Sequence, residues 1–160
     1  MRKNEIGQIT KEEALGKAAS LCSGSEHCIS QVREKLQTWG VHDDWADDII
    51  NRLIQEKFID EARFSRAYCH DKFLYSRWGR VKIGQMLRHL HLTDEDIASG
   101  MTVIPEEDYL QTLSELLRQK DRALRDTNTY QRKGKLVRHL LSRGFEMSLA
   151  IEAVDAFLKR

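Results

Sequence analysis

Side chains that could bind a metal or act as nucleophiles are few and scattered in this sequence. The adjacent Cys/His pairs are Glu26-His27-Cys28 and Cys69-His70. A zinc site needs about four converging ligands with recognisable local spacing, which these pairs lack. No glycine-rich phosphate loop and no Gly-x-Ser-x-Gly motif occurs. We therefore expect no metal, no cofactor and no catalytic activity.

An acidic cluster, Asp43-Asp44 with Asp47-Asp48, has two interpretations. Paired carboxylates can act as a catalytic acid and base. Acidic residues at the start of a helix also offset the positive end of the helix dipole. The second interpretation explains the cluster better, because no nucleophile and base can be assembled around it.

Basic residues concentrate in the middle of the chain. Residues 57–91 hold eight basic and three acidic side chains, a net charge of +5 in a chain that is +1 overall. Residues 128–160 form a second basic block of net +4, whereas residues 92–127 are −5. A local excess of one sign indicates an acidic or phosphate-bearing partner. The alternative is a helix face that is merely solvated.

The candidate contacts to such a partner come from both basic blocks. They are Arg63, Arg66, Arg77, Arg80, Lys82, Arg88, Arg132, Lys135 and Arg138. Arg63 lies nearest the apolar side of its predicted helix, so pairing with an acidic group inside the fold is an alternative for it. Lys82 and Arg88 are predicted to point outward and are the cleaner probes.

The elements that must position these residues are amphipathic helices. In residues 58–92, Asp60 can cap a helix start, and Gly79 is expected to end that helix. At 100° per residue the inward arc of the first helix comprises Phe64, Ala67, Tyr68, Leu74 and Tyr75. Thr10 and Thr93 begin two further capping-box patterns.

Six apolar positions recur at fixed offsets along the chain. The first set is Val32, Leu36, Val41, Ala46, Ile50 and Leu53. It returns as Ile83, Leu87, Leu92, Ile97, Met101 and Ile104. It returns again as Leu136, Leu140, Phe145, Ala150, Val154 and Phe157. Gly40 matches Gly144, and His91 stands between them in the middle copy.

This periodicity predicts an all-α fold of three tandem three-helix repeats in an elongated, curved array. We expect a flexible lead over residues 1–9 and repeats over residues 10–57, 58–104 and 105–160. Trp39, Trp45 and Trp78 are better explained by packing than by stacking on bases. Phe73 lies on the basic side of its helix, so it faces either a neighbouring repeat or a partner.

Composition restricts the cellular setting. No apolar run approaches the roughly 18 residues of a membrane helix, and the N-terminus lacks the apolar core of a signal peptide. The three cysteines follow no disulfide spacing, in agreement with a reducing compartment. These features predict a cytoplasmic protein, and we expect a monomer.

The stretch Phe58-Ile59-Asp60-Glu61-x-Arg63-Phe64-Ser65-x-Ala67-Tyr68 resembles the central signature of the RecX family. Arg77-x-Gly79-x-x-x-Ile83 fits the same pattern. Related signatures are Ser30-x-x-Arg33-x-Lys35-Leu36 and Lys135-Leu136-x-x-x-Leu140-x-x-Arg143-Gly144-Phe145. The resemblance covers residues 11–159, with His91 in place of the usual glycine.

The resemblance implies a bacterial regulator that binds the RecA nucleoprotein filament in its groove and inhibits recombinase and coprotease activity. It implies roles in DNA repair, recombination and the SOS response, and a weaker, salt-dependent affinity for single- or double-stranded DNA. Two alternatives are a stand-alone helical DNA-binding module without a RecA partner and a scaffold whose basic faces are only solvated.

Overall fold

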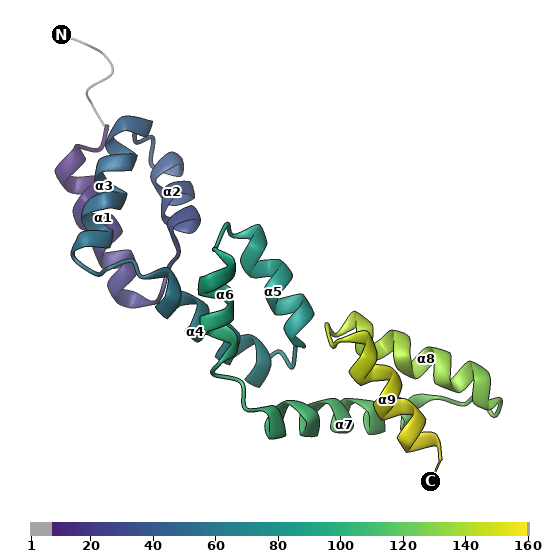
Figure 1. Cartoon of the computed structure of the whole chain (residues 1–160). Helices are drawn as coiled ribbons and strands as arrows, with labels where there is room; N and C mark the ends of the chain where they lie inside the picture. The colour runs from purple at the N-terminus through teal and green to yellow at the C-terminus, as the bar shows by residue number, and fades with distance from the viewer. Residues whose placement is uncertain (1–7, 160) are drawn as a thin grey trace.

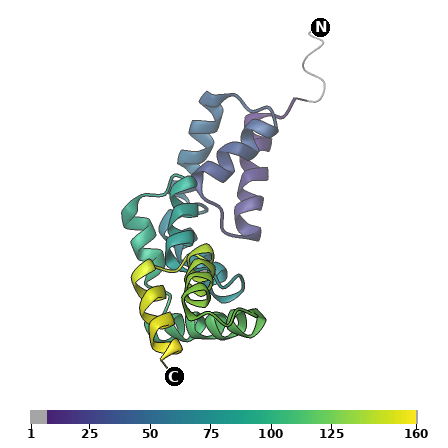
Figure 2. The same ribbon diagram turned by 90° about the vertical axis from the view of Figure 1, so that its right-hand side faces the viewer.

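The computed structural model describes residues 8–159, and every regular element within them is an α-helix (Figure 1). The first seven residues of the expected flexible lead lie outside the described part. The helices are α1 (Lys11–Gly24), α2 (Ile29–Thr38), α3 (Asp43–Gln55), α4 (Glu61–Leu74), α5 (Arg80–His89), α6 (Asp94–Met101), α7 (Glu106–Ala123), α8 (Thr129–Ser142) and α9 (Met147–Leu158). Contacts between helices form three groups, α1–α3, α4–α6 and α7–α9. Figures 1 and 2 show the groups one after another in an elongated arrangement.

Side-chain caps begin several of these helices where the sequence predicts them. Thr10, Asp60 and Thr93 each accept a hydrogen bond from the backbone N–H three residues on, at 3.1, 3.0 and 3.1 Å. Gly79 differs from the expectation. Helix α4 already ends at Leu74, and Gly79 instead caps the start of α5.

The recurring apolar positions are the interior of each group. All six are buried in the first group, and in the other two groups only Met101 and Phe157 are partly exposed. Leu36, Leu87 and Leu140, which share one place in the pattern, are completely buried. The fixed offsets therefore identify three copies of one helical unit, and the tandem-repeat prediction is confirmed.

The turn after the second helix of each repeat has the same backbone conformation. Gly40, His91 and Gly144 have φ angles of 76°, 65° and 95°. In each repeat the next backbone N–H bonds the carbonyl five residues earlier, at 2.9, 3.1 and 3.1 Å. This is the Schellman helix end, which favours glycine because a Cβ is strained at positive φ. His91 thus occupies the position of a glycine.

The inward face of α4 differs from the predicted arc. Leu74 and Tyr75 are 52% and 75% exposed, so their assignment to the core is wrong. The face that packs on α6 contains the small residues Ser65 and Cys69, which are completely buried. A Cβ on Gly100 would lie 2.1 Å from the Ser65 hydroxyl and 2.8 Å from the Cys69 sulfur. Close helix contact through small residues rotates α4 away from the arc that large apolar residues indicate.

Two apolar cores form instead of three. Most buried apolar residues of the first repeat form a core of their own, whereas the second and third repeats share a core that Cys28 of the first repeat joins. Phe73 is part of the shared core, with its ring centroid 5.9 Å from that of Tyr109. Tyr109 in turn lies 5.1 Å from Phe145. Of the two alternatives for Phe73, a neighbouring repeat or a partner, the structure shows the neighbouring repeat.

Backbone groups also join the second and third repeats. The Gly79 N–H donates to the Arg143 carbonyl at 2.8 Å, and the Val81 N–H donates to the Gly144 carbonyl at 2.9 Å. A Cβ on Gly79 would lie 2.3 Å from the Gly144 carbonyl oxygen. The approach of these two turns requires a residue without a side chain at position 79.

We predict that Gly79→Ala destabilises the protein by about 2–3 kcal/mol, because its methyl group overlaps backbone that has little room to move. Gly84→Ala is the matched control. Its Cβ would meet only the flexible ends of the Arg88 and Met101 side chains, at 3.5 and 3.6 Å. Urea denaturation followed by circular dichroism measures both. Equal stability of the two variants would contradict a tight junction.

We predict that His91→Gly stabilises the protein by about 0.5–1 kcal/mol, since it removes the strain of a side chain at positive φ. His89→Gly, at the last residue of α5, should instead destabilise by a similar amount, because it relieves no positive φ and glycine loses more conformational freedom on folding. The same urea titration tests the pair. A loss of stability in His91→Gly would show that the imidazole has a compensating contact.

Candidate partner-binding surface

The nine predicted basic residues fall into two groups that differ in burial and in partners. Four of them, Arg63, Arg77, Arg80 and Arg132, are half-buried and paired with carboxylates. The other five, Arg66, Lys82, Arg88, Lys135 and Arg138, are more exposed or more weakly held. The charge that a partner can reach readily lies in the second group, in which Lys135 alone has a carboxylate closer than 3 Å among the described residues.

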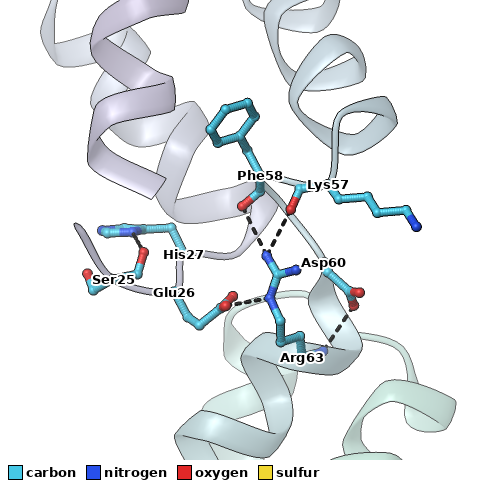
Figure 3. A network of polar contacts seen from close by, with 7 residues as sticks. All are labelled: Ser25, Glu26, His27, Lys57, Phe58, Asp60 and Arg63. Atoms are coloured by element: carbon cyan, nitrogen blue, oxygen red, sulfur yellow. Dashed lines mark hydrogen bonds and ion pairs between the residues drawn. The ribbon is translucent and has the colours of Figure 1, made fainter. Parts of the chain in front are cut away.

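Arg63 joins the first repeat to the second (Figure 3). Its guanidinium pairs with the carboxylate of Glu26. It also donates to the backbone carbonyls of Lys57 at 3.0 Å and Phe58 at 3.3 Å. A guanidinium with a planar set of donors suits this combination of a carboxylate and two carbonyls. These contacts agree with the alternative role of Arg63 inside the fold.

Arg80 joins the second repeat to the third, as Arg63 joins the first to the second. It contacts Glu106 at 2.8 Å and Glu146 at 2.7 Å, and it lies 3.9 Å above the ring of Tyr109. Burial would lower the pKa of Arg80, but its hydrogen bonds to the two carboxylates outweigh burial and raise the pKa. Its charge is therefore permanent and locally compensated.

The hydroxyl of Tyr109 completes this junction. It accepts from the Arg80 backbone N–H at 3.0 Å and donates to the Glu146 carboxylate. Burial and the hydrogen bond to Glu146 raise the pKa of Tyr109 well above its usual value. The phenol therefore keeps its proton, and it acts as a donor that positions Glu146.

Arg77 and Arg132 are held in a similar way. Arg77 pairs with Glu115 of α7. Arg132 pairs with Asp121 and donates to the Asp126 carbonyl at 3.0 Å. Both residues connect separate elements, so we assign them to the fold rather than to a partner.

Three members of the more exposed group, Arg66, Lys82 and Arg88, belong to the second repeat. Arg66 donates to the Ser99 hydroxyl at 3.0 Å. The Lys82 ammonium lies 4.4 Å from the Trp78 ring centroid. Arg88 is 62% exposed and only 3.7 Å from Asp94, a geometry that contributes little stability.

Lys82 and Arg88 lie on different flanks of α5. Six residues along a helix separate two side chains by about 120° around its axis. Arg88 borders a groove between α5 and α6 together with Arg80, Gln85 and Met101. Lys82 instead covers Trp78 beside the third repeat. A partner that contacts both Lys82 and Arg88 must therefore cover about a third of the circumference of α5.

In the third repeat, Lys135 pairs with Asp126 at 2.6 Å. Arg138 is exposed and has no ion pair among the described residues. Tyr130, which the charge pattern did not single out, is 86% exposed on the same helix. The signal that could have found it is an aromatic residue eight positions before Arg138, with Gly134 between them.

Two of the three tryptophans are held by packing and by lysine side chains. Trp39 and Trp78 are half-buried, and their rings are covered by Lys17 at 4.4 Å and by Lys72 at 4.8 Å. Packing therefore explains both rings, as expected. Trp45 differs from them because it is 37% exposed at the start of α3.

The acidic cluster is also explained by the fold. Asp43 and Asp44 occupy the first turn of α3. Asp47 pairs with Arg33 at 2.8 Å, and Asp48 pairs with Lys11 at 2.8 Å. The carboxylates therefore tie α3 to its two neighbours.

Within residues 8–159, the cysteine thiols are buried and no cluster of metal-binding side chains is found. All three cysteines are free and buried, and burial raises the pKa of Cys69 to about 11, so its thiol stays protonated. Among these residues no three His, Cys, Asp or Glu side chains are placed to hold a metal ion. None of the described helices combines the length and apolar character needed to cross a membrane.

An elongated series of three-helix units with exposed basic side chains defines a helical-repeat protein. Proteins of this class contact partners over extended surfaces instead of in one deep pocket. The chain belongs to the RecX family. The model of the second three-helix domain of RecX matches residues 60–101, and that of the third matches residues 106–154.

Similar proteins agree with this assignment. The chain is 25% identical over 154 residues to a protein of Leuconostoc mesenteroides named "Regulatory protein RecX", covering 94% of this chain and 58% of the relative. It is 26% identical over 132 residues to the protein of that name from Haemophilus influenzae, covering 82% and 86%. The chain thus spans little more than half the length of the first relative. Named members of the family are regulatory proteins.

Solved structures share the fold. The crystal structure of RecX from Lactobacillus salivarius superposes with a TM-score of 0.80 at 18% identity, covering 94% of this chain and 97% of that one. A second crystal structure of a regulatory protein RecX gives a TM-score of 0.79 at 21% identity, covering 97% and 78%.

We predict that Arg63→Ala destabilises the protein by about 1–2 kcal/mol, because Glu26 and two carbonyls lose their shared donor in a half-buried site. Arg66→Ala, one turn further along α4, should change stability by less than about 0.5 kcal/mol, because its exposed contact contributes little. Urea denaturation of both variants tests the division between fold-holding and accessible cations. Similar losses would contradict that division.

Proposed function

We propose that this protein binds the RecA nucleoprotein filament and inhibits its recombinase, ATPase and coprotease activities. The observation that carries the proposal is the exposed or half-exposed placement of Arg66, Lys82, Arg88, Lys135 and Arg138 on two successive repeats of a RecX-family chain. The acidic or phosphate-bearing groove of a protein–DNA filament complements such a surface.

The organisation of the chain fits this role. We assign the repeats to residues 10–57, 58–104 and 105–160, preceded by a short lead, and we place the protein in the cytoplasm as a monomer. Cations from the second and third repeats then act together along an extended groove. Direct affinity for DNA is a weaker part of the same interaction, and it weakens further as salt releases the phosphate contacts.

The charge-reversal variant Lys82→Glu/Arg88→Glu tests the proposal. We expect weaker filament binding, a salt dependence flatter by about one unit of slope per lost phosphate contact, and reduced inhibition of RecA-driven ATP hydrolysis on single-stranded DNA. Melting should change little, because Arg88 is largely exposed and the contact of Lys82 with the Trp78 ring contributes only about 0.5–1 kcal/mol.

Lys17→Glu/Lys35→Glu is the matched control in the first repeat. It makes the same change in charge, and Lys17 covers Trp39 at the same 4.4 Å at which Lys82 covers Trp78. If the two variants bind and inhibit equally, the second repeat is not the contact surface. Salt-dependent DNA binding by the parent protein without any effect on RecA would favour a stand-alone DNA-binding module.

A further inference from the structure

A groove on the third repeat combines an exposed aromatic ring, a helix position without a side chain and an unpaired cation. Tyr130, Lys133, Gly134, Val137 and Arg138 line it from α8, and Ile151 lines it from α9. Figure 1 places these two helices at the C-terminal end of the array. None of these residues belongs to the junctions that hold the repeats together.

Tyr130 contributes nothing visible to the fold. Its side chain is 86% exposed, whereas Phe145 and Tyr109 of the same repeat are at most 1% exposed. It stands in the first turn of α8, and no other described aromatic ring lies against it. An aromatic ring left in water loses the burial that normally stabilises it. Most of the Tyr130 side chain is therefore available to a ligand.

Gly134 and Arg138 continue the same ridge of the helix, one and two turns beyond Tyr130. Three guanidinium atoms of Arg138 lie 3.4, 3.6 and 3.8 Å from the position of a Cβ on Gly134. The guanidinium plane therefore lies over the glycine, in the space that a side chain would fill. The Cα atoms of Tyr130 and Arg138 are about 12 Å apart along the axis, and the Arg138 guanidinium folds back over Gly134 toward Tyr130.

The charges around this ridge favour a polyanion. Helix α8 contains four Lys or Arg residues and no acidic residue. Lys133 and Lys135 are paired with Asp155 at 2.7 Å and with Asp126 at 2.6 Å, so they border the groove as compensated charges. Arg138 is the cation of this group that has no carboxylate partner among the described residues.

We propose that this groove binds single-stranded DNA, with one base stacked on Tyr130 and the phosphates beside it contacting Arg138. An aromatic platform next to a cation is the arrangement that binds single strands without reading sequence. A duplex keeps its bases stacked and offers only phosphates, and an acidic peptide offers carboxylates but no base. The groove therefore favours a single strand over both.

This inference deepens the proposed function, because it specifies the DNA contact within it. The test nevertheless uses no recombinase. The probes are a fluorescent oligothymidylate of about fifteen nucleotides, an abasic oligonucleotide of the same length, a duplex and a poly-glutamate peptide. Anisotropy is followed over a salt series for the full chain.

Tyr130→Ala should weaken binding to oligothymidylate about tenfold, since stacking on one aromatic ring is lost. Tyr130→Phe should bind like the parent protein, because the ring and not the hydroxyl is used. On the abasic strand, Tyr130→Ala and the parent should be equal. Arg138→Gln should lower the slope against salt by about 0.7 on both strands, as expected for one phosphate contact.

Two matched controls separate the groove from exposed residues in general. Tyr75→Ala removes another ring that is 75% exposed, on the second repeat. Arg118→Gln removes an exposed cation of α7. Both variants should bind oligothymidylate like the parent protein.

Four results would overturn the proposal. They are a parent protein that does not bind oligothymidylate, a Tyr130→Ala variant that binds like the parent, an equal loss on the abasic strand, and poly-glutamate or duplex binding that depends more on Tyr130 than single-strand binding does. None of them bears on filament inhibition, which the Lys82→Glu/Arg88→Glu variant measures separately.

Discussion

The contact between Gly79 and Gly144 determines how the second and third repeats are joined. Two backbone hydrogen bonds cross it, and a Cβ on either glycine would overlap the other repeat. Because the turns meet so closely, Arg80 at the start of α5 reaches both Tyr109 and Glu146 of the third repeat. The second and third repeats also share one apolar core. The two repeats are therefore packed together as a single unit.

The first repeat is joined differently. Its core is separate from the shared core except at Cys28, which packs in the shared core, and at Phe58 and Ile59, which pack in the first. Polar contacts add further links to the second repeat. Arg63 binds Glu26 and two carbonyls, and the Ser30 hydroxyl donates to the Leu90 carbonyl at 2.9 Å. Polar contacts at a partly exposed boundary contribute less than a shared core does. The predicted cost of Arg63→Ala measures this link directly.

The repeat architecture could be predicted from the sequence because it rests on apolar spacing. Leu36, Leu87 and Leu140 occupy one place in a pattern that the offsets make visible, and all three are buried. The same reasoning failed for Leu74 and Tyr75. Helix α4 packs through Ser65 and Cys69 against Gly100, and small residues carry little signal in an apolar arc. The contact between Gly79 and Gly144 also could not be predicted from local sequence patterns, because it joins turns that are 65 residues apart.

The basic surface was the least predictable feature, because net charge along the chain does not report pairing in space. Residues 57–91 carry +5 and residues 92–127 carry −5. The fold brings these segments together, and the partners of Arg77, Arg80 and Arg88 include Glu115, Glu106 and Asp94 from the acidic segment.

Basic side chains of the third repeat are also paired with carboxylates of the acidic segment. Arg132 and Lys135 pair with Asp121 and Asp126 of the same acidic segment. Much of the apparent basic charge therefore stabilises the fold. Among the nine predicted residues the charge free for a partner is concentrated where pairing is weak or absent, as at Arg88 and Arg138. A surface of this kind binds through a few accessible cations and their neighbouring side chains, so variants at those positions should affect binding more than their share of the total charge suggests.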